Sequence, residues 1–179
     1  MQSPDLSQTY FELFGLKPIF AIDLDQLKVE QRRLQASYHP DRHVNESDRN
    51  KRLSVQVASW INQAYETLQD PVKRSRYLLE ISGADFPDDS TTTSDTGFLM
   101  EQIELREAVE ACRQDPDGLA SSELIEARLW QREQELVSEF VARFEASDLD
   151  AAIGVSRKMQ FIQRIQHQLA EIQFELEEA

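Results

Sequence analysis

Hydrophobic positions recur at helical spacing along most of the chain, and short polar breaks divide the pattern into successive segments. In the first half, the pattern predicts a short helix at residues 9–16 and longer helices at about 24–38 and 48–68. A fourth helix is predicted to begin after Asp70, a residue type that often caps helices, and to end at Gly83, because glycine is a usual stop residue. Apolar stripes on the two longer helices suit an antiparallel hairpin.

Residues 83–95 interrupt this pattern with acidic side chains, a proline and small hydroxyl residues, which cannot form a core and therefore predict a linker. Beyond the linker, the pattern predicts three helices at about 96–113, 119–146 and 148–178. Their short connections favour antiparallel neighbours in a bundle. The predicted fold class is all-α, with a helical domain at 1–82, a linker at 83–95 and a C-terminal three-helix bundle at 96–179.

The helix predicted at 96–113 differs from an ordinary surface helix because it has two apolar faces. Its expected core stripe, within an arc of about 60°, consists of Phe98, Leu105, Val109 and Cys112. The opposite half carries a second apolar group beside two carboxylates: Leu99, Met100, Ile103, Glu104 and Glu107. Phe161, at the edge of the stripe on the last helix, is expected to extend this group. Either a neighbouring element covers the second face, or the face is a docking surface for another protein.

A short loop follows the helix predicted at 24–38, with the sequence Tyr38-His39-Pro40-Asp41-Arg42. Proline at position 40 disfavours the α conformation at the preceding residue, so the helix is expected to end near Tyr38. An imidazole and a carboxylate then lie two residues apart on an exposed loop, where binding residues are often found. The helix before the loop carries the cationic side chains Lys28, Arg32 and Arg33 on its solvent side. Such a face is usually only solvated, but here it leads directly into the loop.

The net charge of −14 is unevenly distributed. Residues 1–82 contain 11 basic residues (Lys and Arg) and 11 acidic residues (Asp and Glu). Residues 83–179 contain 8 basic and 22 acidic residues. This asymmetry indicates two units with different partners. The acidic half would repel a phosphate backbone and the neutral half lacks excess positive charge, so no nucleic-acid partner is expected.

Other functions are disfavoured by residues that the chain lacks. The single cysteine, Cys112, excludes an internal disulfide and a multi-cysteine metal site, and it is expected to be a small buried residue. His39 and His43 have a metal-binding spacing, but Pro40 separates them and no third ligand is evident, so no metal or other cofactor is expected. No apolar run approaches the roughly 18 residues of a membrane span, and no signal peptide is evident. We therefore expect no membrane partner and a cytoplasmic location.

The loop and its surroundings resemble a J-domain, the module by which co-chaperones engage an ATP-driven chaperone of the DnaK type. The resemblance is carried by the loop, the run at 61–68, Asp70-Pro71, and the run at 74–77. As a whole, the chain resembles the HscB family of iron–sulfur cluster assembly co-chaperones. The most specific segments for that family are residues 10–16 and 98–107.

The resemblance implies that this chain is a co-chaperone with two binding surfaces and no catalytic activity of its own. An HscA-type chaperone of the DnaK family would have its ATPase stimulated through His39, Pro40 and Asp41, with docking by Lys28, Arg32, Arg33 and Arg42. An IscU-type iron–sulfur scaffold protein would bind the bundle at positions Leu99, Met100, Ile103, Glu104, Glu107 and Phe161.

Two alternatives remain at this point. The chain is a J-protein for a different client, with the acidic bundle as a general adaptor, or it is an enzyme that uses His39 and Asp41 as acid and base. The second alternative is disfavoured, because no serine or cysteine is marked as a nucleophile beside His39.

Overall fold

The computed structural model describes residues 7–38, 48–85 and 95–178, and all regular secondary structure within these ranges is helical. The predicted all-α class is confirmed. The chain divides into two compact units, Met1–Ser82 and Gly83–Ala179. The predicted loop residues His39, Pro40, Asp41 and Arg42 lie outside the described residues, as does His43.

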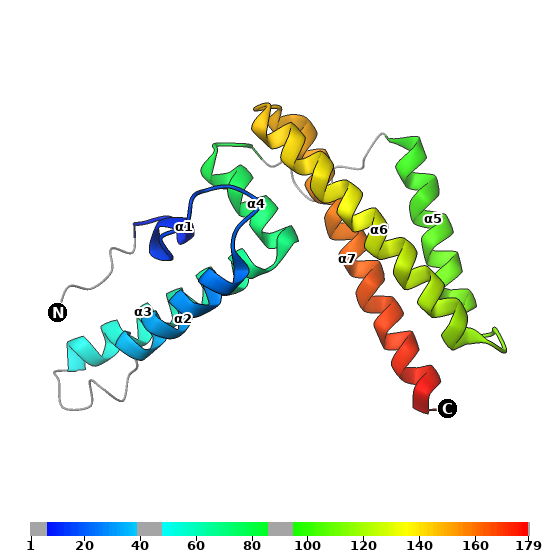
Figure 1. Ribbon diagram of the computed structural model, residues 1–179, viewed down its shortest axis with the longest axis horizontal. Coiled ribbons are helices and arrows are strands. Elements are labelled where there is room, and N and C mark those ends of the chain that lie inside the picture. Colours follow the sequence, from blue (N-terminus) through cyan, green and yellow to red (C-terminus); the bar gives the residue numbers. More distant parts are fainter. Residues whose placement is uncertain (1–6, 39–47, 86–94, 179) are drawn as a thin grey trace. The chain divides into compact units, whose positions relative to one another are not determined.

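The first unit consists of a short helix and three longer ones. Their bounds are Tyr10–Leu13 for α1, Leu24–Tyr38 for α2, Asp48–Gln69 for α3 and Pro71–Ile81 for α4. Helices α2 and α3 lie side by side as the predicted hairpin (Figure 1). Their facing stripes are buried, and the core includes Leu27, Leu34, Val57, Ile61, Ala64 and Leu68.

Local signals in the sequence account for both ends of α4. The Asp70 carboxylate accepts hydrogen bonds from the backbone N–H groups of Val72 and Lys73, at 2.8 and 2.9 Å, and so caps α4. Gly83 follows α4 with φ of +77°, a conformation that glycine adopts without strain. The predicted start and stop of this helix are therefore confirmed.

Helix α1 is held against the rest of the unit by aromatic packing. The Tyr10 backbone N–H donates a hydrogen bond of 2.9 Å to the Tyr77 hydroxyl, and the two rings stack with centroids 4.4 Å apart. Burial raises the pKa of Tyr77. Nearby, the guanidinium of buried Arg74 lies 4.6 Å from the Phe20 ring centroid and donates to the Leu68 carbonyl. These contacts join α1 to α4, and α4 to the end of α3, through specific polar groups as well as apolar area.

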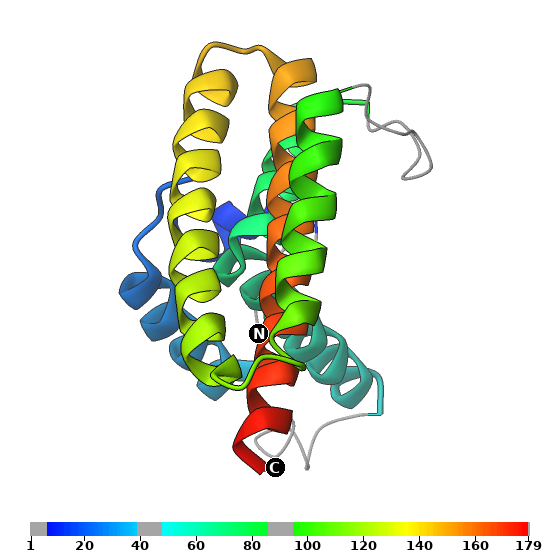
Figure 2. The same ribbon diagram turned by 90° about the vertical axis from the view of Figure 1, so that its right-hand side faces the viewer.

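The second unit is a bundle of three helices, seen from two directions in Figures 1 and 2: α5 (Thr96–Ala111), α6 (Gly118–Glu145) and α7 (Leu149–Glu178). The predicted stripe of α7 is buried in its centre, with Val155, Met159, Ile162, Ile165, Leu169 and Ile172. The connection before α6 is tight at Gly118, where an added Cβ would lie 2.4 Å from the Cys112 carbonyl oxygen. Only glycine fits at this position without a backbone shift.

Candidate functional site

The outward face of α5 is open in the second unit. Met100 is 64% exposed and Ile103 is 57% exposed, while Leu99 is half-buried beside them. The opposite face packs into the bundle, since Phe98, Leu105, Val109 and Cys112 are all buried. The two-faced helix predicted from the sequence is confirmed, and no described element covers Met100 and Ile103. We call Leu99, Met100, Ile103, Glu104 and Glu107 the α5 face.

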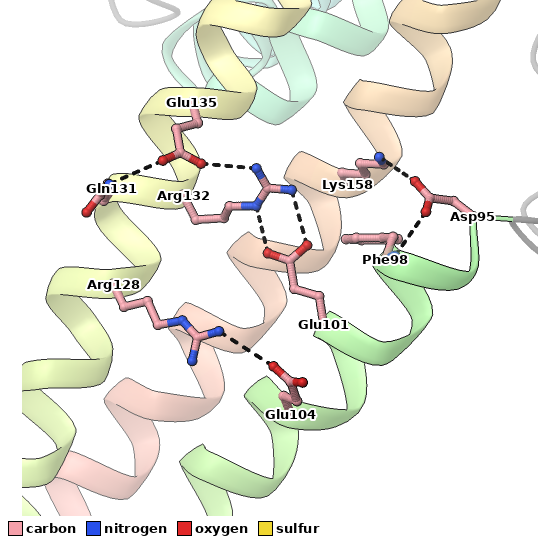
Figure 3. Close-up of polar contacts among 9 residues, drawn as sticks. All are labelled: Asp95, Phe98, Glu101, Glu104, Arg128, Gln131, Arg132, Glu135 and Lys158. Atoms are coloured by element: carbon pink, nitrogen blue, oxygen red, sulfur yellow. Dashed lines mark hydrogen bonds and ion pairs between the residues drawn. The ribbon is translucent and has the colours of Figure 1, made fainter.

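The carboxylates of the α5 face are accessible to solvent. Glu107 is exposed, and Glu104 lies beside Arg128 of α6, with 3.8 Å between the Glu104 Oε2 and Arg128 Nη2 atoms (Figure 3). This distance is too long for a hydrogen bond, and both side chains are more than half exposed. Glu104 is thus weakly held within the chain.

A stronger ion pair joins α5 to α6 one turn away. Arg132 binds the Glu101 carboxylate in a bidentate manner, with Nε–Oε1 and Nη2–Oε2 distances of 2.7 and 3.1 Å (Figure 3). Its Nη1 atom also donates to Glu135 at 3.1 Å. The hydrogen bond to Glu101 is the main cause of a raised pKa for Arg132. This pair joins the Glu101 side of α5 to α6, while the α5 face is turned away from the bundle.

The N-terminus of α5 is fixed to α7 by a second polar cluster. Asp95 accepts hydrogen bonds from the Phe98 backbone N–H at 3.0 Å and from Lys158 Nζ at 2.7 Å (Figure 3). The bond from Lys158 is the main cause of the lowered pKa of Asp95. The Lys158 ammonium also lies 5.3 Å from the Phe98 ring centroid. Asp95 is therefore the N-cap of α5.

Phe161 does not extend the exposed apolar group, in contrast to the expectation from the sequence. It is only 7% exposed, and its ring packs edge-on against Phe98 with centroids 5.5 Å apart. The Arg106 guanidinium lies over the same ring, also at 5.5 Å. The expectation was wrong because position 161 faces α5, and side chains of α5 cover it. Phe161 supports the α5 face from beneath.

Three basic residues that surround the α5 face were not predicted from the sequence: Arg128, Arg132 and Lys158. The spacing of these residues is a recognisable pattern: Arg128 and Arg132 are four residues apart on one helix, and Glu101 and Glu104 are three residues apart on another. The pairing could not be assigned from the sequence, because it depends on which face of α6 is turned toward α5.

The basic side chains of α2 are placed as expected from the sequence. Lys28, Arg32 and Arg33 are exposed, on the side of α2 away from buried Leu27 and Leu34. Arg33 forms an ion pair of 2.6 Å with Glu30, within the same helix. The cationic surface of α2 is thus accessible to a partner.

Other candidate sites of the described chain have simple structural roles. Cys112 is buried, its Sγ lies 3.5 Å from the Ala108 carbonyl oxygen, and burial raises its pKa. His167 is exposed on α7. Among the residues that the structure describes, no group of three or more His, Cys, Asp or Glu side chains is arranged to hold a metal ion. None of the helices in these ranges combines the length and apolar character that crossing a membrane requires.

Comparison with known proteins places both units in described families. Residues 9–77 match the DnaJ domain, and residues 94–170 match the family model described as the HSCB C-terminal oligomerisation domain. A co-chaperone protein HscB homolog of Shewanella baltica (strain OS195) is 36% identical over 167 residues, which cover 92% of this chain and 96% of the relative.

Solved structures agree with this assignment over nearly the whole chain. The chaperone HscB from Vibrio cholerae is 32% identical, with a TM-score of 0.86, and the match covers 94% of this chain and 99% of that one. Human co-chaperone protein HscB is 27% identical with a TM-score of 0.86, over 95% of this chain and 84% of the human one. The chain belongs to the HscB family, J-domain co-chaperones that act in iron–sulfur cluster assembly together with Hsp70-type chaperones.

Proposed function

We propose that this co-chaperone binds an IscU-type iron–sulfur scaffold protein and delivers it to an HscA-type chaperone of the DnaK family, whose ATPase it stimulates. The observation that carries the proposal is the open α5 face, on which Met100 and Ile103 are more than half exposed. The chain itself catalyses no reaction in this proposal. It acts by holding two other proteins together.

The α5 face has the composition of a protein-binding surface. Large apolar side chains at its centre, Met100 and Ile103, can be buried by a partner. Glu104 and Glu107 at its edge suit a partner with basic groups, and the excess of acidic residues in this half of the chain favours the same charge. Phe161 takes the role of a support, because it packs under Phe98 and Arg106.

The first unit provides the contact with the chaperone. Exposed Lys28, Arg32 and Arg33 on α2 suit an acidic surface, and such contacts accelerate docking more than they increase affinity. This docking should weaken as salt screens the charges. His39, Pro40, Asp41 and Arg42 take part through the resemblance to J-domains, with the Asp41 carboxylate suited to a basic group on the chaperone.

Joining the two surfaces in one chain raises the local concentration of the scaffold at the chaperone. A short linker gives effective concentrations in the millimolar range, roughly, without any new contact between scaffold and chaperone. The chain therefore needs only moderate affinity for each partner to promote their encounter.

The proposal is tested by the ATPase rate of the purified chaperone, with this co-chaperone and with or without the scaffold. Asp41→Asn should abolish the stimulation of the ATPase and leave scaffold binding unchanged. Met100→Ala with Ile103→Ala should abolish scaffold binding and leave the stimulation by the co-chaperone alone unchanged. If both sets of substitutions impair the same activity, the proposed division between the two units is wrong.

A further inference from the structure

The α5 face is too small to form a stable protein interface by itself. Helix α5 has 16 residues. A helix of that length is about 24 Å long and about 10 Å wide with its side chains, so one face offers roughly 240 Å² of footprint. Even twice this value lies below the about 800 Å² per partner of a standard interface. A partner bound to α5 must therefore also cover a neighbouring helix.

The seam between α5 and α7 is closed by polar contacts along its length. Lys158 pairs with Asp95 near the start of α5, Gln168 donates to Glu110, and Arg113 pairs with Glu175 near its end. Between these contacts, Arg106 covers the Phe161 ring. The groups along this seam are bound to one another, so they offer little to a partner.

The seam between α5 and α6 is different, because it contains a groove of about 350 Å³. Its floor is formed by Leu105 and Leu129, which are 2% and 0% exposed, and its walls carry Arg128 and Arg132. Glu104, of the α5 face, reaches across this seam toward Arg128 (Figure 3). The groove thus adjoins the α5 face directly.

The two arginines of the groove differ in how fully their donors are used. Arg132 is bound to two carboxylates at 2.7 to 3.1 Å and is 28% exposed. Arg128 is 58% exposed, and the contact that the structure gives it is the ion pair of 3.8 Å with Glu104. A guanidinium has five N–H donors in a planar fork that fits a carboxylate. Arg128 can therefore bind a further carboxylate while it stays next to Glu104.

An exposed apolar residue continues the surface beyond Arg128. Leu124 lies one helical turn before Arg128 on α6 and is 75% exposed. An interface that covers Met100, Ile103 and Leu124 would enclose Arg128, and its 3.8 Å contact with Glu104 would compensate the enclosed charge only weakly. A bound partner must therefore supply a negative group at this point.

We propose that the scaffold protein covers both α5 and α6, and that it presents a carboxylate to Arg128. This inference rests on the proposed function and adds a specificity-determining residue to the same site. Basic groups of the scaffold would lie opposite Glu104 and Glu107, and its acidic group opposite Arg128. The two signs of charge set the orientation of the partner, because a partner whose acidic and basic groups were exchanged between α5 and α6 would bring like charges together.

The test is calorimetric titration of the full chain with purified scaffold protein, using Arg128→Glu, Arg128→Gln and Leu124→Ala. The matched control is Arg143→Glu. Arg143 is an exposed arginine of the same helix with a single ion pair of 3.5 Å, to Asp148, and it lies about 22 Å from Arg128 along the axis. Both charge reversals change the net charge equally. Thermal melting of each variant checks the fold.

Arg128→Glu should weaken scaffold binding by at least about tenfold, the order of change expected when a partner's charge meets a like charge. Arg128→Gln and Leu124→Ala should each weaken it several-fold, and Arg143→Glu should change it by less than twofold. Exchange of one acidic residue of the scaffold for lysine should restore binding to Arg128→Glu. That rescue would identify the partner residue, and loss of fold alone would not produce it.

The outcomes separate this inference from the proposed function. If the wild-type chain does not bind the scaffold, both are overturned. If Met100→Ala with Ile103→Ala abolishes binding while Arg128→Glu matches Arg143→Glu, the scaffold occupies α5 without Arg128, and this inference alone is overturned. Tighter binding by Arg128→Gln would also overturn it, because Arg128 would then only mask Glu104.

Discussion

Breaking the Arg132–Glu101 ion pair should loosen α5 while α6 and α7 stay packed. The pair is bidentate, and its side chains are 28% and 23% exposed. Apolar packing of α5 on α7, through residues such as Phe98 and Val109, does not depend on it. The substitutions Arg132→Met and Glu101→Gln, singly and together, form a double-mutant cycle that isolates the interaction from the contact of Arg132 with Glu135.

The magnitude follows from the geometry and the exposure of the pair. Exposed ion pairs contribute about 0–1 kcal/mol to stability, and hydrogen bonds to charged groups about 1.5–3 kcal/mol when water is excluded. Because this pair is bidentate and half-buried, we expect a coupling energy of about 1–1.5 kcal/mol. The Arg128–Glu104 pair, at 3.8 Å and more than half exposed, is the matched control and should couple by less than about 0.5 kcal/mol.

The assay is urea unfolding followed by tryptophan fluorescence. The chain has two tryptophans, and a Trp60→Phe background leaves Trp130 of α6 as the reporter of the second unit. Hydrogen exchange locates the effect, since amides of α5 should lose protection before those of α7. A coupling energy for Arg132–Glu101 no larger than that of the control pair would refute the reasoning, and so would equal loss of protection in α5 and α7.

Three further predictions concern single side chains of the second unit. Phe161→Ala should lower the free energy of unfolding, measured by urea unfolding, by about 3–5 kcal/mol, because it empties a buried site. Met100→Ala should change this free energy by less than about 0.5 kcal/mol and impair only scaffold binding, which titration measures. Gly118→Ala should lower the melting temperature, because the added Cβ would meet the carbonyl oxygen of the preceding turn at 2.4 Å. Gly154→Ala should raise the melting temperature, because there is open space around this glycine. The opposite order of melting temperatures would contradict the close approach at Gly118. Asp95→Asn should lower the melting temperature at neutral pH, and the difference from the wild type should shrink as the pH falls through the lowered pKa of Asp95. The reason is that a carboxylate whose pKa is depressed by folding stabilises the fold above its unfolded pKa and loses this contribution when it is protonated. A difference in melting temperature that is independent of pH would exclude the charge as the cause.

Much of the architecture was predictable from local patterns. The bounds of α2 and α4, the cap at Asp70, and the two apolar faces of α5 follow from spacing and from the chemistry of single residues. A cap is formed within three or four residues, and a helix face is defined by the 100° step between neighbours, so both are readable without knowledge of the fold. The resemblance to J-domains rests on the same kind of local evidence.

The surroundings of the α5 face were not predictable in this way. Helical spacing put Phe161 at the edge of a stripe, and only the packing of α5 decided that its ring is covered by Phe98 and Arg106. In the same way, the spacing of Arg128 and Arg132 was visible, but not their different partners.

The sequence by itself determined the helices, their ends and which sides of α5 are apolar, because these properties depend on residues close together in the chain. The tertiary structure alone decided which of these side chains remain exposed, and that a groove with a partly free arginine adjoins them. The physical reason is that exposure and pairing depend on the rotation of each helix about its axis. That rotation is set by all three helices packing together, and no single helix encodes it.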